Sequence, residues 1–98
     1  MAVKVIITRR FKEGYIREAA KLLIEARNNA MHEEGYISSE TLNNCDNPDE
    51  IVVLSMWESR QDWWRYKESA ARQELEHRFD EMMETKTQTV TYDLGLKY

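Results

Sequence analysis

The stretch Ile51-Val52-Val53-Leu54-Ser55-Met56-Trp57 decides the fold, because large apolar side chains alternate onto both of its faces. Such a run is typical of a strand that is covered on each side. Immediately before it, residues 43–49 are rich in turn formers, and residues 36–43 alternate loosely as another strand. We therefore predict a hairpin with strands over residues 36–43 and 50–57.

The segments on either side of this hairpin add further strands and helices. Residues 3–8 are rich in β-branched side chains and predict a strand that Gly14 separates from the next element. Residues 15–34 carry apolar side chains at helical spacing, and Gly35 follows as a stop signal. Ser59 suits the N-cap of a helix over residues 60–84, within which Ser69 is a candidate interruption. Residues 87–96 alternate as a last strand.

The resulting element order, βαββαβ, predicts an α+β, ferredoxin-like fold with a four-stranded antiparallel sheet and two helices on one face. Two helices cover only one face of such a sheet, yet the strand over residues 50–57 is apolar on both. A second copy that packs its sheet against the first would bury the other face, so the pattern predicts a homodimer through the sheet faces. The alternative is an apolar face that stays in contact with solvent.

Composition excludes several classes of function. The 98 residues suit one domain over 1–98. Fourteen Lys and Arg against eighteen Asp and Glu, with no basic cluster, argue against nucleic acid as a partner. The apolar runs are too short to span a membrane and the first residues show no signal-peptide pattern, so we expect a cytoplasmic protein. One cysteine, Cys45, and two widely separated histidines predict neither an internal disulfide nor a metal site.

Arg27 is the most informative polar residue, because it lies within the apolar stripe of Leu23, Ala26 and Ala30. A charge in that position is costly unless it is paired or functional. The arginine stem can pack on the core while its head reaches solvent or a carboxylate such as Glu40. Alternatively, its guanidinium anchors an anionic or phenolic substrate.

Aromatic side chains gather around the third strand and the second helix, where they either pack in the core or line a slot for a flat ligand. At about 100° per residue, one continuous helix would place Trp64 on the same face as Leu75 and Phe79 and would turn His77 outward. A break at Ser69 would change the phase of the first half but not of the second. His32 is also expected at the surface, near the end of the first helix.

Several short motifs together resemble the antibiotic biosynthesis monooxygenase domain over nearly the whole chain. They are the run Gly35-Tyr36-Ile37-Ser38, the turn Asn47-Pro48-Asp49-Glu50, and Trp57-Glu58-Ser59 followed by Asp62-Trp63. The resemblance implies a dimeric α/β barrel. It also implies one of several activities, because the family includes cofactor-independent oxygenases of aromatic polyketides, quinol monooxygenases and haem-degrading monooxygenases.

A resemblance to the haem-degrading branch of the family would imply an Asn in the first strand and a Trp and a His in the second helix. This chain does not have that pattern. The first strand has no Asn, Tyr66 stands where the Trp would be, and Glu76 stands where the His would be. His77 is one residue away and is expected to point into solvent. We therefore expect no haem degradation and no cofactor. With both histidines outside, conventional nucleophilic hydrolysis is also excluded.

The sequence and the resemblance together predict a homodimeric, cofactor-independent monooxygenase that oxidises a small electron-rich aromatic substrate of phenol, quinol or anthrone type. The anion of such a substrate can itself pass an electron to O₂, so a dry aromatic slot suffices. We expect Trp64 and Trp57 to wall the slot, Arg27 or Tyr66 to orient a substrate oxygen, and Tyr36 to close one end, with Trp64 and Tyr66 as the catalytic pair. The alternative is a non-catalytic ligand-binding or stress-response protein of the same fold.

Overall fold

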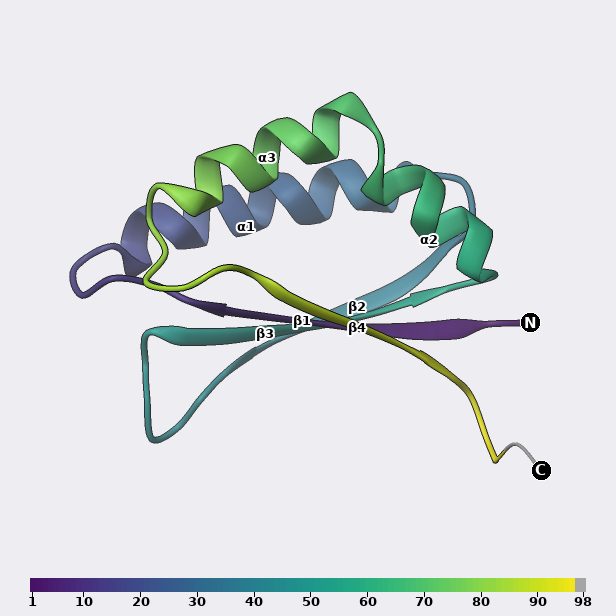
Figure 1. Ribbon diagram of the computed structural model, residues 1–98, viewed down its shortest axis with the longest axis horizontal. Helices are drawn as coiled ribbons and strands as arrows, with labels where there is room; N and C mark the ends of the chain where they lie inside the picture. The colour runs from purple at the N-terminus through teal and green to yellow at the C-terminus, as the bar shows by residue number, and fades with distance from the viewer. Residues whose placement is uncertain (97–98) are drawn as a thin grey trace.

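The computed structural model describes residues 1–96 and places the helices together over one face of a sheet (Figure 1). In chain order the elements are β1 (Val3–Arg10), α1 (Ile16–Met31), β2 (Tyr36–Asn43), β3 (Glu50–Trp57), α2 (Arg60–Lys67), α3 (Ala70–Asp80) and β4 (Gln88–Asp93). The strands pair antiparallel in the order β2-β3-β1-β4. The ferredoxin-like α+β prediction and the hairpin of β2 and β3 are therefore confirmed.

The predicted helix over residues 60–84 is two helices, because serine hydroxyls cap both. The Ser59 side chain accepts a hydrogen bond from the Asp62 backbone N–H at 3.1 Å, as predicted for the N-cap of α2. Ser69 does the same for α3 through the Arg72 backbone N–H at 3.2 Å. A serine that captures these otherwise unpaired N–H groups begins a new helix with its own phase. The candidate interruption at Ser69 is therefore confirmed, and a single continuous helix over residues 60–84 is wrong.

The strand ends follow from pairing rather than from local composition. β1 continues to Arg10, beyond the predicted end at residue 8, because Arg9 and Arg10 pair with the first residues of β3. β4 is shorter than the predicted 87–96, and its last residue, Asp93, pairs with Val3, the first residue of β1. Residues 94–96, the last that the structure describes, lie beyond the pairing of β4 with β1.

The core lies between the helices and the inner face of the sheet, which in β1 is formed by Val3, Val5, Ile7 and Arg9. Two apolar clusters fill this layer. One joins α1 and α3 around Phe11, Leu22 and Phe79, and the other joins β1, β3 and α2 around Trp57, Trp63 and Tyr66. Strand alternation thus places a charged side chain, Arg9, in the layer that holds the core.

The opposite face of the sheet is apolar and has no helix over it (Figure 1). By alternation and strand register it carries Ile6, Val52, Leu54, Met56, Val90 and Tyr92. Val90 and Tyr92 are 47% and 51% exposed in the single chain. This face is the one that the sequence predicts to be covered by a second copy. Across residues 1–96 the helices lack the combination of length and apolar character that crossing a membrane requires.

Candidate active site

A cavity lies between α1 and the inner face of the sheet, with β1, β2 and β3 as its floor and the α2 and α3 side chains at its inner end. Its volume is about 40 Å³. This is enough for ordered water but less than the roughly 150 Å³ of an engineered cavity that accepts benzene. An open groove of about 310 Å³ adjoins it, and Leu23, Arg27 and Thr41 line both. A second open groove, of about 410 Å³, adjoins the cavity at Trp63 and Arg72, which line both.

The walls of the cavity are aromatic, and Trp57 is at the centre of the group. The Trp57 ring stacks on Tyr66 with centroids 5.3 Å apart, and the Tyr36 ring meets it edge-on at 5.6 Å. Trp63 packs against both Trp57 and Tyr66, at 5.8 Å and 6.3 Å. Trp57, Trp63 and Tyr66 are each at most 4% exposed. These rings form a large part of the core and also present an apolar surface to the cavity.

The hydroxyl groups that line the cavity differ in how firmly they are held. The Tyr36 hydroxyl and the Ser39 hydroxyl share a hydrogen bond of 2.7 Å. The Trp57 ring N–H donates to the Ser55 hydroxyl at 3.2 Å. The Tyr66 hydroxyl donates to the Ala26 carbonyl at 3.5 Å, which is long for an O–H···O bond. Tyr66 therefore has the hydroxyl that a ligand oxygen can redirect most easily.

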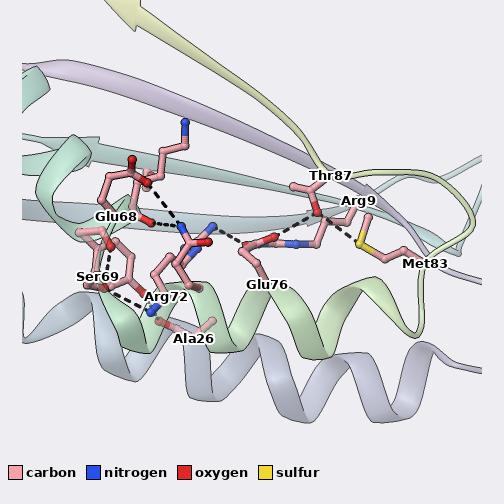
Figure 2. A network of polar contacts seen from close by, with 12 residues as sticks. Arg9, Ala26, Glu68, Ser69, Arg72, Glu76, Met83 and Thr87 are labelled. Atoms are coloured by element: carbon pink, nitrogen blue, oxygen red, sulfur yellow. Dashed lines mark hydrogen bonds and ion pairs between the residues drawn. The ribbon is translucent and has the colours of Figure 1, made fainter.

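Two buried arginines and the partly exposed Glu76 form a charged cluster beside the inner end of the cavity, and Figure 2 shows its polar contacts. Arg9 and Arg72 are only 2% and 7% exposed; Arg9 donates a hydrogen bond to the Oε1 atom of Glu76, and Arg72 forms an ion pair with the same atom. The Arg72 Nη2 atom lies 2.8 Å from Oε1, and the Thr87 hydroxyl donates to the other carboxylate oxygen at 3.2 Å. Arg9 also lies over the Phe79 ring at 4.1 Å. These contacts fix the cluster between β1, α3 and the segment before β4.

Burial and mutual charge change the pKa values of this cluster. Burial lowers the pKa of Arg9 to about 10, with Glu76 opposing the change and Arg72 adding to it. Burial alone would raise the pKa of Glu76, but the charges of Arg9 and Arg72 outweigh it, so that pKa is below its ordinary value. Near neutral pH both Arg9 and Glu76 are therefore ionised.

Four of the five predicted site residues line the cavity: Tyr36, Trp57, Tyr66 and Arg27. Arg27 is an exposed residue at the mouth, where the cavity meets the groove. The alternative ion pair with Glu40 is wrong, because Glu40 pairs with Leu54 and so faces the other side of the sheet.

The placement of Trp64 corrects the sequence prediction. Its side chain is 56% exposed and is absent from the cavity lining, where Trp63 stands instead. The prediction assumed one continuous helix, in which Trp64 would share a face with Leu75 and Phe79. Because α3 begins anew after Ser69, the direction of its side chains does not predict the direction of those in α2. Trp64 instead contacts Lys67, whose ammonium group lies 5.0 Å from the ring centroid.

Sequence reasoning assigned no role to the charged lining residues Arg9 and Arg72, and it named Trp63 only within the aromatic group that packs in the core or lines a slot. The Ser59 cap and the i, i+3 spacing of Trp63 and Tyr66 would have placed both rings on the inner face of a short helix. For Arg9, its alternation with Val5 and Ile7 was the available signal.

The predicted outward positions of the histidines and the cysteine are confirmed. His32, His77 and Cys45 are all exposed, and the Nδ1 atom of His32 lies 2.6 Å from the Asn28 carbonyl oxygen. No group of three or more metal-ligating side chains comes together in residues 1–96.

Comparison with known proteins relates this chain to a family. The model of the antibiotic biosynthesis monooxygenase family matches residues 2–78. No curated protein sequence matches the chain. Among solved structures, a conserved protein from Methanosarcina mazei Go1 superposes with a TM-score of 0.88 at 20% identity, over 94% of this chain and 91% of that one. SnoaB, a cofactor-independent oxygenase from Streptomyces nogalater, superposes with a TM-score of 0.87 at 9% identity, over 98% and 95%. At these identities the structures share the fold.

Proposed function

The chain belongs to the antibiotic biosynthesis monooxygenase family, and from this premise we propose that it is a cofactor-independent monooxygenase of a small electron-rich aromatic compound of phenol, quinol or anthrone type. The observation that carries the proposal is the cavity itself. Its walls are the stacked rings of Trp57 and Tyr66 with Tyr36 edge-on, and buried cationic side chains stand at its inner end. A flat, electron-rich ring with an ionisable oxygen matches that combination.

The chemistry needs little from the protein beyond position and environment. In an anthrone, the ring anion passes an electron to O₂, and the reacting CH₂ carbon ends as a carbonyl. One oxygen atom stays in the product and the other leaves as water, with all four electrons supplied by the substrate. The buried aromatic walls exclude water from the reacting ring, and fixed positive charge stabilises its anion.

Individual side chains would then have distinct roles. Trp57 supports the ring of the substrate, and Tyr36 closes the end of the cavity near β2. The loosely held hydroxyl of Tyr66, or the guanidinium of Arg27 at the mouth, orients a substrate oxygen. Trp64 has no part in this arrangement because its side chain lies outside.

The experiment is oxygen uptake with a panel of anthrones and quinols. We expect consumption above the buffer rate for at least one member, and the same rate in Trp64→Ala, which changes an aromatic side chain outside the cavity. An oxygen uptake rate equal to the buffer rate for every compound in the panel would contradict the proposal.

The small cavity favours one second candidate, a non-catalytic ligand-binding protein. At about 40 Å³ the space holds no aromatic ring without movement of its walls. If this candidate is right, anthrones or quinols quench the fluorescence of the cavity tryptophans without any oxygen uptake. Quenching that is accompanied by oxygen uptake would show that the protein is an enzyme.

We further propose that two copies associate through the outer faces of their sheets. The support is the alternation that leaves Val52, Leu54 and Met56 on a face without helices. Sedimentation at micromolar concentration should give twice 11.7 kDa. Leu54→Lys should shift the protein to the monomer mass, and a monomeric wild-type chain would contradict the proposal.

The place of action that we propose is the cytoplasm. Cys45 is exposed and free, and an exposed lone thiol suits a reducing compartment. Cell fractionation of the native protein tests this, and recovery in a secreted or membrane fraction would contradict it.

A further inference from the structure

The buried cluster at the inner end of the cavity has one more positive charge than negative charge. Arg9 and Arg72 both contact the carboxylate of Glu76, and they share the same oxygen of it. Among the ion pairs of the described residues, neither arginine has a second carboxylate. Two guanidinium groups are thus balanced by one carboxylate in a region where both arginines are less than a tenth exposed.

Arg9 also has an unused hydrogen-bond donor. Its Nε–H is buried and has no partner in the described structure. An unpaired buried donor is unfavourable, and more so on a charged group. Both Arg9 and Arg72 line the cavity, so the residue with the unpaired donor and the unbalanced charge belong to the same cavity wall.

Aromatic contacts hold the two guanidinium groups in place without neutralising them. Arg9 lies over Phe79 at 4.1 Å, and Arg72 lies 5.5 Å from the Trp63 ring and 5.4 Å from the Tyr66 ring. A cation–π contact orients a cation but leaves its full charge. A purely structural cluster would be expected to use every donor and to balance its charge. This one does neither.

We propose that the inner end of the cavity binds the oxyanion of a flat aromatic ligand, a carboxylate or a phenolate, between Arg9 and Arg72. The ring of that ligand lies along the stacked Trp57 and Tyr66 side chains. The proposal rests on the proposed function for the identity of the cavity as the substrate site, and it adds that the substrate is bound as an anion. Guanidinium groups are well suited to such oxygens because their N–H donors match the oxygen geometry.

The first experiment compares benzoate with benzamide, which has the same ring and nearly the same shape but no charge. Binding to the full chain is measured by titration calorimetry. We expect benzoate to bind about tenfold more tightly or better. In Arg72→Met the stem remains while the cluster becomes neutral, so the preference should fall to about one. The control is Arg78→Met, which removes a positive charge from α3 at an exposed ion pair with Glu25 of α1. This variant should keep the preference for benzoate over benzamide.

A second variant protects the test against a simple folding defect. Glu76→Gln keeps the shape of the side chain and leaves the cluster with two uncompensated positive charges, so the preference for benzoate over benzamide should rise above that of the wild type. Opposite shifts in Arg72→Met and Glu76→Gln are not expected from loss of structure. Equal binding of benzoate and benzamide to the wild type, or an unchanged preference in Arg72→Met, would overturn the proposal.

The two sources of the oxyanion are separated with 4-nitrophenol, which absorbs visible light only as the phenolate. If the site binds phenolates, adding the protein should increase the visible absorbance of the 4-nitrophenolate ion at a pH at which free 4-nitrophenol is mostly protonated. Tight benzoate binding without that increase assigns the site to carboxylates. These binding results stand apart from oxygen uptake, so an anion-binding protein that consumes no oxygen would refute the proposed function and keep this inference.

Discussion

The rings of Trp57 and Tyr66 lie nearly parallel, 23° apart with centroids separated by 5.3 Å, although one comes from β3 and the other from α2. Both residues are 1% exposed. The contact fixes α2 against the sheet and directs the Tyr66 hydroxyl toward the Ala26 carbonyl of α1. Packing and polar function therefore reside in different atoms of the same side chain.

Tyr66→Phe separates these two contributions, because it keeps the stacked ring and removes the hydroxyl. The hydrogen bond that is lost is long, so the free energy of unfolding should change by less than about 1 kcal/mol. If the hydroxyl orients a substrate oxygen, turnover should fall by about tenfold or more. Oxygen uptake and urea unfolding measure the two effects. Full activity in Tyr66→Phe would assign the orienting role to Arg27.

The adjacent residues Trp63 and Trp64 should respond very differently to substitution by alanine. Trp63 is 4% exposed and packs on two other rings, so Trp63→Ala should cost about 3 kcal/mol or more of unfolding free energy. Trp64 is 56% exposed, and Trp64→Ala should cost less than about 1 kcal/mol. Urea unfolding of the two variants tests which of these two α2 side chains faces the core. Equal losses would show that the helix is rotated from the described position.

Arg27→Met tests whether the cation at the mouth of the cavity anchors a ligand. Arg27 is an exposed residue, so the melting temperature should hold or rise when its charge is removed. If Arg27 anchors an anion, the same change should weaken binding by roughly 1.5 to 3 kcal/mol. Calorimetry with benzoate measures the affinity. Unchanged affinity would leave the anchor role to the buried arginines alone.

Glu76 should make stability depend on pH in the acid range. Its pKa in the folded protein is below the ordinary value of 4.5, so its contribution is complete above that value and is lost as the pH falls through the folded pKa. Glu76→Gln should lose about 3 kcal/mol near neutral pH, because it leaves two buried arginines unpaired. That loss should shrink as the pH falls below about 4.5. Asp62 and Glu50, whose pKa values are also lowered, are present in both proteins and cancel in the difference.

Gly35 is expected to tolerate a side chain less well than Gly14. Both have positive φ, +86° and +89°, so alanine at either position is strained by about 1 kcal/mol or more. At Gly35 an added Cβ would also meet the Asp62 side chain at 2.3 Å, whereas at Gly14 it would meet nothing within 4 Å. Thermal unfolding should therefore rank Gly35→Ala below Gly14→Ala. The reverse order would contradict the described approach of residues 35 and 62.

Much of the fold was predictable because local patterns report which way a side chain faces. The apolar alternation of residues 50–57 indicated a strand covered on both sides, and the turn formers at 43–49 indicated the hairpin. The spacing of His77 relative to Leu75 and Phe79 correctly predicted its outward position, since all three lie in α3. Three cavity aromatics, Tyr36, Trp57 and Tyr66, were likewise identified from the sequence.

The sequence by itself determined the order of the strands and helical segments, the apolar face of each strand and the outward position of both histidines, because these depend on periodicity within one element. Only the tertiary structure decided that Arg9 and Glu76, which are 67 positions apart, meet at one end of the cavity with Arg72. It also decided that Trp63 and not Trp64 faces inward, since a single cap at Ser69 separated the phases of two helices. Periodicity specifies which direction a residue faces, whereas the residue that it meets depends on how separate elements pack.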